Sequence, residues 1–516
     1  MSEPAVLHVA LANEAATARL MADLALLMSA GDVVTLSGDL GAGKTAAARA
    51  LIRYLAGDPE LEVPSPTFTL AQTYDLPSFP LLHADLYRVN DASELEEIGL
   101  APLPEGTVAL IEWPERAPDL LPADRIDIAL SHRPSLGSSA RAAEIQGHGR
   151  DAAKVERLQA LRGFLELAGQ LDADRRRMPG DASTRSYARL VKGGQSTILM
   201  NSPRRPDGPA VYDGKSYSAA VHLAEDVKPF VAIANGLRER GYSAPAILHA
   251  DLDEGFLITE DLGSEGFVAG DPPAPIVERY QTAVDMLAAL HREPLPDRLP
   301  LAPHIDYEIP PFDDAAMAVE VGLALEWYLP DKGVAIATAA HAEFLLLWSE
   351  LFARLADTPR TWMLRDFHSP NLIWLERRKD TGRVGLLDFQ DAVMGPPAYD
   401  LVSLLQDARV DVPETIEIAM LARYAKERRD ADPAFDPAAF AEQYAIMSAQ
   451  RNTRLLGTFA RLNRRDGKPQ YLRHQPRVWA YLTRALAHPS LAHYREWCAA
   501  HMPAPATDLQ SRFTEC

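Results

Sequence analysis

Apolar residues in the first 150 positions fall into short continuous runs separated by stretches with helical spacing. A helical pattern covers residues 14–29, an apolar strand follows at 32–37, and an alanine-rich helix follows a glycine-rich turn at 45–55. Further strands are expected at 68–74, 81–86, 108–112 and 126–130, with a last edge strand at 141–145. Strands that alternate with helices predict an α/β domain with a mostly parallel sheet.

The pattern changes after residue 150. Helical spacing at 155–171 comes before short strand-like segments near 186–200, and the chain is mainly helical from residue 276 onward, except around 361–395. This order predicts an α+β arrangement of a mixed small lobe and a helical large lobe, with a cleft between them. The expected borders are 1–150 for the α/β domain, 151–178 for a helical linker, 179–265 for the small lobe and 266–516 for the helical lobe.

Composition and charge narrow the class of protein. The 516 residues are 47% hydrophobic and 24% charged, as in globular proteins, which excludes global disorder. The net charge is −20, and residues 1–150 alone hold 21 acidic and 10 basic side chains, a net charge of −11. Because phosphate contacts supply most non-specific affinity for nucleic acid, we expect no direct nucleic-acid contact.

Cysteine content and hydropathy bear on location. Cys498 and Cys516 are the only cysteines, too few for a disulfide framework. The first 30 residues lack a basic segment before an apolar core, and no stretch approaches the ~20 apolar residues of a membrane span. We therefore expect a cytoplasmic protein without membrane contact.

The run GDLGAGKT at 38–45 fits the phosphate-loop pattern G-x-x-x-x-G-K-[ST], between a strand and a helix. Glycines let backbone N–H groups surround phosphate oxygens, Lys44 reaches the β- and γ-phosphates, and Thr45 offers its hydroxyl to Mg²⁺. The motif predicts a site for ATP and Mg²⁺. Its expected nucleotide-binding residues are Gly38, Asp39, Gly41, Ala42, Gly43, Lys44 and Thr45.

Two carboxylates stand at the ends of neighbouring apolar strands. Asp85 follows the apolar run from residue 81, and Glu112 ends the run from residue 108. A phosphate-loop site needs such a carboxylate near Mg²⁺. We predict Thr45, Asp85 and Glu112 as metal ligands, and Glu112 also as the catalytic residue that positions the attacking water.

Five runs of this domain, in their order and spacing, resemble the TsaE family, the ATPase subunit of the bacterial tRNA threonylcarbamoyladenosine machinery. They are LSGDLGAGKT at 36–45, VPSPTFTL at 63–70, HADLYR at 83–88, ELEEIGL at 94–100 and IEWPE at 111–115. The resemblance implies ATP and Mg²⁺ binding, and a switch-like loop at Ser65, Pro66 and Thr67. It also implies that the partners are the other subunits of the tRNA threonylcarbamoyl transferase complex, which this ATPase would assemble or reset. Ala84 departs from the family, which usually has an aromatic residue there.

Two other interpretations of the first domain stay open. A small-molecule kinase can use the same loop, but such kinases often clamp phosphates with several arginines, and only Arg49, Arg53 and Arg88 lie between residues 45 and 100. The other interpretation is a nucleotide-dependent interaction module with slow hydrolysis, which the acidic charge favours.

The strongest motif of the second region is LRDFHSPNLIW at 364–374, followed by LLDFQD at 386–391. An Asp with an Asn five residues later, and then a strand-borne Asp-Phe, repeats the protein-kinase layout. Asp366 is the predicted catalytic base for an attacking hydroxyl, and Asn371 and Asp388 are the predicted Mg²⁺ ligands. We expect His368 to hold the loop by hydrogen bonding, and the Asp400 carboxylate to fix the catalytic loop.

Residues 175–480 resemble the aminoglycoside phosphotransferase and choline kinase superfamily, so the second region is expected to be an α+β bilobal protein-kinase-like domain. The runs DASTRSYAR at 181–189, ILMNSP at 198–203 and QRNTRLLGTFAR at 450–461 are similar to the AmgK-type branch. That branch phosphorylates the anomeric hydroxyl of N-acetylmuramate and N-acetylglucosamine with ATP in cell-wall recycling, which implies a small-molecule sugar substrate. The resemblance further implies nucleotide contacts by Ser183, Thr184, Arg185 and Glu260.

The kinase-like region departs from the wider kinase plan at one position. Protein kinases carry a lysine on the third strand, where this chain has Asn201. Arg185, Arg189 and Lys192 are candidate replacements. The alternative substrates are aminoglycosides and choline or ethanolamine. A basic cluster is expected to be a solvated face or part of a sugar-phosphate pocket; it comprises Arg451, Arg454, Arg461, Arg464, Arg465, Lys468 and Arg473.

Overall fold

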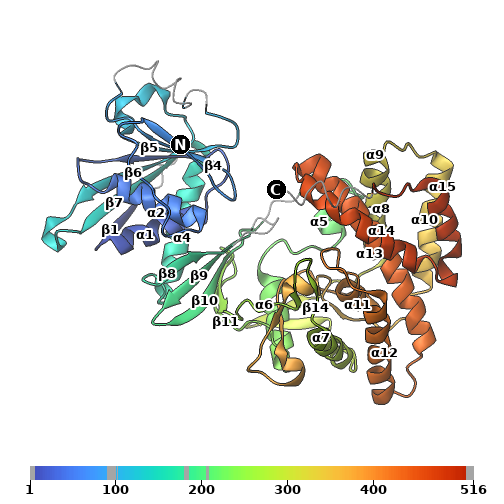
Figure 1. The fold of residues 1–516 in the computed structure, drawn as a ribbon. Helices are drawn as coiled ribbons and strands as arrows, with labels where there is room; N and C mark the ends of the chain where they lie inside the picture. Colours follow the sequence, from blue (N-terminus) through green and yellow to red (C-terminus); the bar gives the residue numbers. More distant parts are fainter. Residues whose placement is uncertain (1–5, 90–99, 101–102, 179–184, 205–207, 507–516) are drawn as a thin grey trace. The chain divides into compact units, whose positions relative to one another are not determined.

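The computed structural model describes residues 6–89, 100, 103–178, 185–204 and 208–506. The chain forms two compact units (Figure 1). Unit 1 comprises Met1–Pro203 and Leu248–Asp261, and unit 2 comprises Arg204–Ile247 and Leu262–Cys516. The expected domain borders at residues 150, 178 and 265 stay predictions.

Unit 1 begins with a sheet whose described strands have the order β1-β7-β6-β2-β5-β4-β3. The neighbours β6, β2, β5 and β4 run parallel, and β1, β7 and β3 pair antiparallel at the two sides. The α/β domain with a mostly parallel central sheet is therefore confirmed. The strands are β1 Val6–Leu11, β2 Val33–Ser37, β3 Ala71–Asp75, β4 Pro80–Asp85, β5 Val108–Glu112, β6 Arg125–His132 and β7 Arg141–His148, and the helices are α1 Glu14–Ala25, α2 Lys44–Ala56 and α4 Ala152–Leu167.

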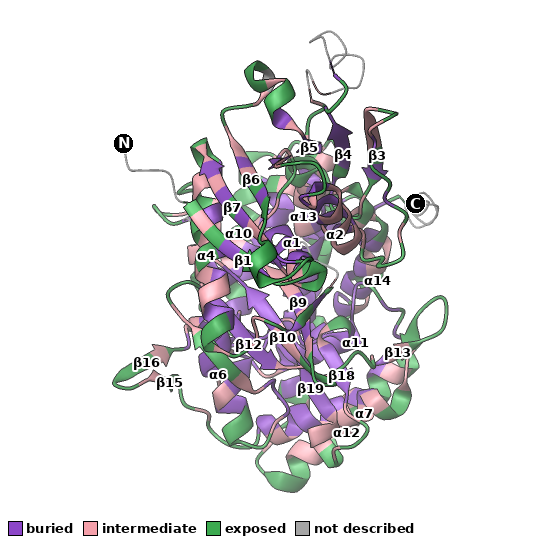
Figure 2. Ribbon diagram, turned by 90° about the vertical axis from the view of Figure 1, so that its left-hand side faces the viewer, coloured by how far each residue is buried: buried purple, intermediate pink, exposed green. Residues whose placement is uncertain are grey.

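The sequence explains why these elements form. All five residues of β5 are buried, as expected for a parallel strand covered on both faces, and Figure 2 shows β4 and β5 in the buried colour. The Asn13 side chain accepts a hydrogen bond from the Ala16 backbone N–H and caps α1. Helix α2 begins directly after the phosphate-loop glycines and ends at Ala56, where the following Gly57 has a left-handed backbone and caps the helix.

A second sheet belongs to the same unit. Its described strands have the order β11-β12-β10-β9-β8. Leu26, just after α1, packs with Leu161 and Phe164 of α4 and with Phe256 of the second sheet in one apolar cluster. The second sheet therefore shares a hydrophobic core with the phosphate-loop domain. Its strands are β8 Asp174–Arg177, β9 Ser186–Lys192, β10 Gln195–Asn201, β11 Ile247–Asp251 and β12 Phe256–Glu260.

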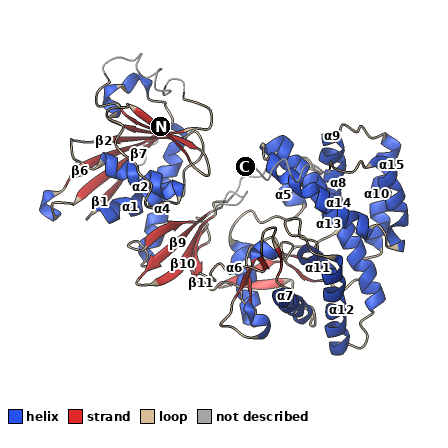
Figure 3. Cartoon of the chain, in the orientation of Figure 1, coloured by secondary structure: helices blue, strands red, loops and turns tan. Residues whose placement is uncertain are grey.

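Unit 2 is largely helical, as Figure 3 shows by colour, and its longest described helix is α13, which contributes many of the buried side chains. Its described helices are α5 Tyr217–Ala220, α6 Lys228–Glu239, α7 Val277–Leu290, α8 Asp314–Leu323, α9 Leu329–Asp331, α10 Thr338–Ala353, α11 Ala398–Leu405, α12 Glu414–Ala431, α13 Pro437–Asp466, α14 Gln475–Ala485 and α15 Ala492–His501. Its short strands are β13 Val268–Ala269, β14 Ala274–Pro275, β15 Arg298–Ala302, β16 Ile305–Glu308, β17 Thr361–Met363, β18 Leu372–Trp374, β19 Val384–Leu386 and β20 Val393–Gly395.

The structure corrects two details of the expected elements. The strand at 141–148 is not an edge strand, because β1 pairs with it on the outer side. The region after residue 276 that was expected to be helical contains the β15–β16 hairpin. These two strands are short, so an alternation of apolar and polar residues is hard to detect in the sequence. Among the described helices, none is long and apolar enough to cross a membrane.

Candidate active sites

Backbone geometry at the phosphate loop requires glycine at defined positions. Gly38 has a φ of 129°, and a Cβ placed on it would lie 2.1 Å from the Leu130 carbonyl oxygen of the neighbouring strand β6. Gly43 has a φ of 105° and precedes the first residue of α2. Only glycine adopts these conformations readily, so the loop curls at the N-terminus of α2, where backbone N–H groups attract anions.

Lys44 folds its side chain across this loop. Its Nζ donates to the carbonyl oxygens of Gly38, at 2.6 Å, and Asp39, at 3.0 Å. The same ammonium lies 3.5 Å from the ring centre of Trp113, which has a left-handed backbone with φ 60°. Burial lowers the pKa of Lys44, while Glu112 and Glu115 act to raise it. The lysine is thus held at the loop by carbonyl dipoles and an aromatic face.

The two predicted carboxylates lie side by side at the carboxyl ends of parallel strands. Asp85 of β4 and Glu112 of β5 are register partners. Glu112 Oε2 accepts from the Thr45 hydroxyl at 2.9 Å, and Glu112 Oε1 lies 2.9 Å from His83 Nε2. The sheet therefore brings together three of the predicted metal-binding side chains at the end of the phosphate loop.

Asp85 also fixes the segment with the switch-like residues. Its Oδ2 accepts from the hydroxyls of Ser65, at 3.0 Å, and Thr67, at 2.5 Å, and its Oδ1 accepts from the Tyr87 backbone N–H at 3.0 Å. The loop after α2 and the end of β4 are thus connected through one carboxylate.

Arg141 is a residue of this site that motif reasoning missed. Its Nε donates to the Ala42 carbonyl at 3.0 Å, and its second amino group lies 3.4 Å from the Gly41 carbonyl. It stands at the start of β7, almost a hundred residues after the loop, and no local pattern in the sequence marks it. His83 and Trp113 were also missed as contacts of Glu112 and Lys44, although both lie within the runs that resemble the TsaE family.

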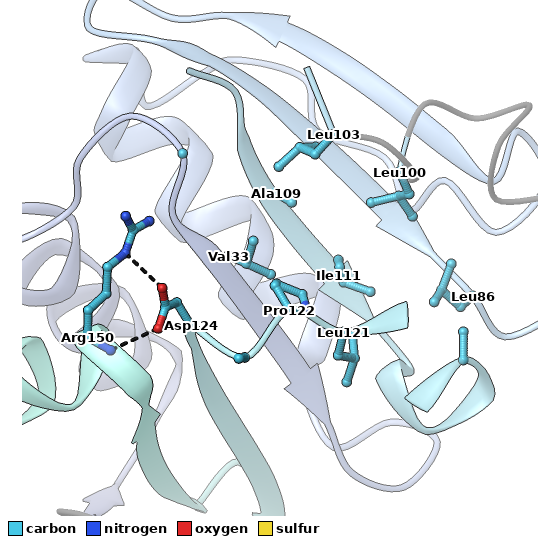
Figure 4. A pocket seen from close by; sticks show the side chains of 13 residues that line it. Val33, Leu86, Leu100, Leu103, Ala109, Ile111, Leu121, Pro122, Asp124 and Arg150 are labelled. Carbon is cyan, nitrogen blue, oxygen red and sulfur yellow. Dashed lines mark hydrogen bonds and ion pairs between the residues drawn. The ribbon is translucent and has the colours of Figure 1, made fainter. Parts of the chain in front are cut away.

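A separate apolar pocket of about 490 Å³ lies against the same sheet (Figure 4). The side chains of Val33, Leu103 and Ile111 line it, and an ion pair between Asp124 and Arg150 closes one end. None of the predicted site residues lines it. Its charged lining residues, Asp124 and Arg150, are paired with each other, and the rest of its lining is mainly apolar.

The predicted catalytic-loop residues of unit 2 lie close together in the structure. The Asn371 amide donates to the Asp366 carbonyl oxygen at 3.0 Å and lies 3.4 Å from Asp388 Oδ2. Gln390 donates to the other Asp388 oxygen at 2.8 Å. Arg365 and Asp388 both have left-handed backbones, with φ of 63° and 55°. Such strained non-glycine residues cluster at functional sites.

Asp400 holds the catalytic loop from beneath. Its two carboxylate oxygens accept from the backbone N–H groups of Leu364, at 2.7 Å, and Arg365, at 2.9 Å. Burial raises the pKa of Asp400 to about 7, although both amide hydrogen bonds act to lower it. The expectation that Asp400 fixes this loop is confirmed.

A buried ion cluster lies beside the loop. Glu320 of α8 is fully buried and contacts Arg365, Arg454 at 3.3 Å and the Gln450 amide at 2.8 Å. Burial acts to raise the pKa of Glu320, but Arg454 and Arg365 outweigh it and hold this pKa below its usual value. Glu320 was not predicted, because a glutamate in a helical pattern normally faces solvent.

This cluster corrects the expectation for the basic residues of α13. Arg451 is buried, with its guanidinium 3.3 Å from the Gln406 carbonyl, and Arg454 donates to the Tyr399 hydroxyl at 2.8 Å. These two arginines therefore face the core and do not form a solvated face. Arg464 and Arg465, by contrast, are exposed as expected.

His368 lies next to the Asp366 carboxylate. It is buried, its Nε2 lies 3.8 Å from Asp366 Oδ1, and burial lowers its pKa. Burial acts to raise the pKa of Asp366 itself, but His368, Arg454 and Arg365 outweigh it, so this pKa lies below its usual value. Asp366 therefore stays a carboxylate at neutral pH.

The predicted nucleotide contacts of the second sheet are only partly described. Ser183 and Thr184 lie outside the described residues. Arg185 and Glu260 are half-buried residues of unit 1, just before β9 and at the end of β12. Two of the candidate replacement cations are engaged elsewhere: Arg189 pairs with Asp261 at 2.7 Å, and Lys192 pairs with Asp172 at 2.6 Å.

Asn201, at the position of the kinase lysine, has its own partner. Its side-chain oxygen accepts from Arg157 Nε at 3.0 Å, and its amide donates to the Ser186 hydroxyl at 2.9 Å. Arg157 belongs to α4, and its side chain also stacks on Phe256. The position is therefore occupied by a hydrogen-bonded structural pair.

Comparison with known proteins identifies both halves. The profile of the threonylcarbamoyl adenosine biosynthesis protein TsaE matches residues 11–141, and the profile of the phosphotransferase enzyme family matches residues 174–442. An N-acetylmuramate/N-acetylglucosamine kinase of Caulobacter vibrioides is 38% identical over 361 residues, which are 67% of this chain and 97% of that protein. A tRNA threonylcarbamoyladenosine biosynthesis protein TsaE of Rickettsia bellii is 42% identical over 106 residues, 20% of this chain and 73% of that protein.

Among solved structures, a choline/ethanolamine kinase family protein from Mesorhizobium loti is 15% identical with a TM-score of 0.41, over 66% of this chain and 98% of that one. The family matches confirm both resemblances and the two fold classes inferred from the sequence. The chain therefore belongs to two families at once, and joins an ATPase-type domain of the TsaE family to an ATP-using enzyme domain of the phosphotransferase family.

Proposed function

We propose that the phosphotransferase domain transfers the γ-phosphoryl group of ATP to the anomeric hydroxyl of N-acetylmuramate or N-acetylglucosamine, in cell-wall recycling. The observation that carries this proposal is the convergence of Asp366, Asn371 and Asp388 on one loop and the adjoining strand end. The Caulobacter relative, which is named for these two sugars, supports the choice of substrate.

In this reaction the sugar hydroxyl oxygen bonds to the γ-phosphorus, the bond to the ADP oxygen breaks, and the hydroxyl proton passes to Asp366. His368 and the nearby arginines lower the pKa of Asp366, so it is ionised at neutral pH and has a free carboxylate oxygen for the proton. Asn371 and Asp388 fit Mg²⁺, since they supply adjacent oxygen donors, which this cation prefers. Mg²⁺ bound there would neutralise the phosphate charge.

For the TsaE domain we propose ATP hydrolysis that drives the tRNA threonylcarbamoyl transferase complex, with the other subunits as partners. Lys44 and the loop amides would bind the phosphates, and Thr45, Asp85 and Glu112 offer the oxygen donors for Mg²⁺. Glu112 would position the attacking water. The proposed location of both activities is the cytoplasm.

The kinase proposal is tested with a panel of substrates on the full chain. N-acetylmuramate, N-acetylglucosamine, an aminoglycoside and choline are each incubated with ATP, ADP release is scored, and the product is identified by ³¹P NMR. A sugar 1-phosphate is expected. Turnover on choline or the aminoglycoside alone would instead support the alternative substrates.

The ATPase proposal is tested in a variant of the full chain that has lost its kinase activity. Asp366→Asn in the full chain serves this purpose, and its ATPase rate is measured with and without the other transferase subunits. We expect the subunits to raise the rate, and Lys44→Ala in the same background to abolish it. A fast ATPase rate that does not change when the other subunits are added would contradict the partner assignment.

A further inference from the structure

A groove in unit 1 collects positive charge in an otherwise acidic protein. It lies among α1, α2 and β8, and its volume is about 750 Å³. Its only acidic lining residues among the described ones are Glu14 and Asp174. We call it the arginine groove, after its lining residues Arg19, Arg49, Arg53, Arg175, Arg176, Arg177 and Arg189.

Some of these guanidinium groups are already neutralised. Arg175 is buried against Asp23, and Arg189 pairs with Asp261. Arg19 approaches Asp174 at 3.4 Å, a carboxylate that is 75% exposed. These contacts leave a surplus of positive charge on α2 and on the outer face of β8.

Arg49 and Arg53 use only part of their donor groups. Arg49 Nε donates to the Val63 carbonyl at 3.1 Å, and Arg53 Nε donates to the Leu61 carbonyl at 2.9 Å. Their terminal amino groups have no hydrogen-bond partner among the described residues. Two guanidinium groups one helical turn apart on α2 thus line the groove with free donors.

Arg176 contributes a further positive charge on strand β8. It is exposed, has no ion-pair partner among the described residues, and is the direct cross-strand neighbour of Arg189. Because Asp261 already neutralises Arg189, Arg176 is the charge at this place on the strand that remains for a bound anion.

We propose that the arginine groove is a binding site for a small molecule that carries two or more phosphate groups. Guanidinium groups bind phosphate oxygens through paired, charge-assisted hydrogen bonds. The volume lies within the roughly 300–1,000 Å³ of small-molecule sites. An RNA backbone is the weaker choice, because the net charge of −20 repels an extended polyanion.

The groove is linked to the phosphate loop of unit 1 through hydrogen bonds. Arg49 and Arg53 hold the segment that leads to Ser65 and Thr67, which contact Asp85 at the phosphate loop. A ligand that contacts Arg49 and Arg53 would therefore contact residues that support the phosphate-loop site, whichever sugar the kinase uses.

The test measures inorganic pyrophosphate binding to the full chain by isothermal titration calorimetry. The chain is saturated with a non-hydrolysable ATP analogue and Mg²⁺, so that the nucleotide sites are filled, and buffer of equal Mg²⁺ content is the reference. We expect one site, and at least about tenfold weaker binding in the triple variant Arg49→Gln, Arg53→Gln, Arg176→Gln. Arg429→Gln, an exposed arginine of α12 without an ion-pair partner among the described residues, is the matched control and should leave the affinity unchanged.

Three outcomes would overturn the proposal. They are no binding by the wild type, unchanged binding in the triple variant, and loss of binding in Lys44→Ala, which would assign the anion to the phosphate loop. If the triple variant does not fold, Arg176→Glu, which changes one exposed residue, must still weaken binding. A gel-shift experiment with tRNA distinguishes a small phosphorylated ligand from RNA. If tRNA binds through these arginines and pyrophosphate does not bind, the groove is an RNA-binding surface and the proposal fails.

Discussion

Glu112 and Glu320 are equally buried carboxylates, each beside a proposed phosphate site, yet their partners differ in kind. Glu112 is 1% exposed and meets the hydroxyl of Thr45 and the imidazole of His83. Glu320 is 0% exposed and meets two guanidinium groups and an amide. At the TsaE site the buried carboxylate therefore serves as a hydrogen-bond partner, whereas at the kinase loop it compensates two buried positive charges. Charge removal should damage function at the first site and folding at the second.

The largest effect on activity is expected at Asp366, the proposed proton acceptor of the kinase. Asp366→Asn removes the proposed proton acceptor while keeping the shape, and should lower the sugar-kinase kcat by about 10²–10⁴-fold. The measurement is ADP release with N-acetylmuramate, and the ATPase rate of the TsaE domain should not change. Asp357→Asn, an exposed aspartate of the same unit, is the control. Equal loss in both variants would contradict the assignment of Asp366.

Glu320→Gln tests the charge cluster itself. The substitution leaves Arg365 and Arg454 buried without a carboxylate, which should destabilise unit 2 by about 3–5 kcal/mol. The measurement is thermal unfolding, where the midpoint of the phosphotransferase transition should fall. Glu343→Gln, on the exposed side of α10, should leave the midpoint unchanged. A stable Glu320→Gln protein would show that the arginines find other partners, and the contrast with Glu112 would fail.

The same contrast separates what a sequence can predict here from what it cannot. The phosphate loop at 38–45 and the pair Asp366 and Asn371 were predicted, because their spacing is local and their backbone follows from it. Glu320 and Arg141 were missed, because Glu320 meets Arg454 across 134 residues and Arg141 meets Ala42 across 99. Burial of a charge is decided by distant chain segments, and helical periodicity alone assigns a glutamate to the surface.

Glu112→Gln is the counterpart of the Glu320 variant in the TsaE domain. Its partners are a hydroxyl and an imidazole, so a glutamine can keep hydrogen bonds to both, and the unfolding midpoint should change little. The ATPase rate stimulated by the partner subunits should nevertheless fall by about 10²-fold, because the proposed water-positioning carboxylate is gone. A large loss of stability with an unchanged rate would reverse the roles proposed for the two glutamates.

The smallest effect is expected at Arg141, which supports the phosphate loop without meeting the proposed phosphates. Arg141→Gln removes the donors to the Ala42 and Gly41 carbonyls, each worth roughly 0.5–1.5 kcal/mol, so nucleotide affinity should fall by about three- to tenfold. Calorimetric titration of ADP into the full chain measures it, as the change in the binding event that Lys44→Ala removes, with the exposed Arg133→Gln as the control. Because the loop geometry also depends on Gly38 and Gly43, most of the affinity should survive. A loss as large as that of Lys44→Ala would mean that a charge, and not the backbone, organises this site too.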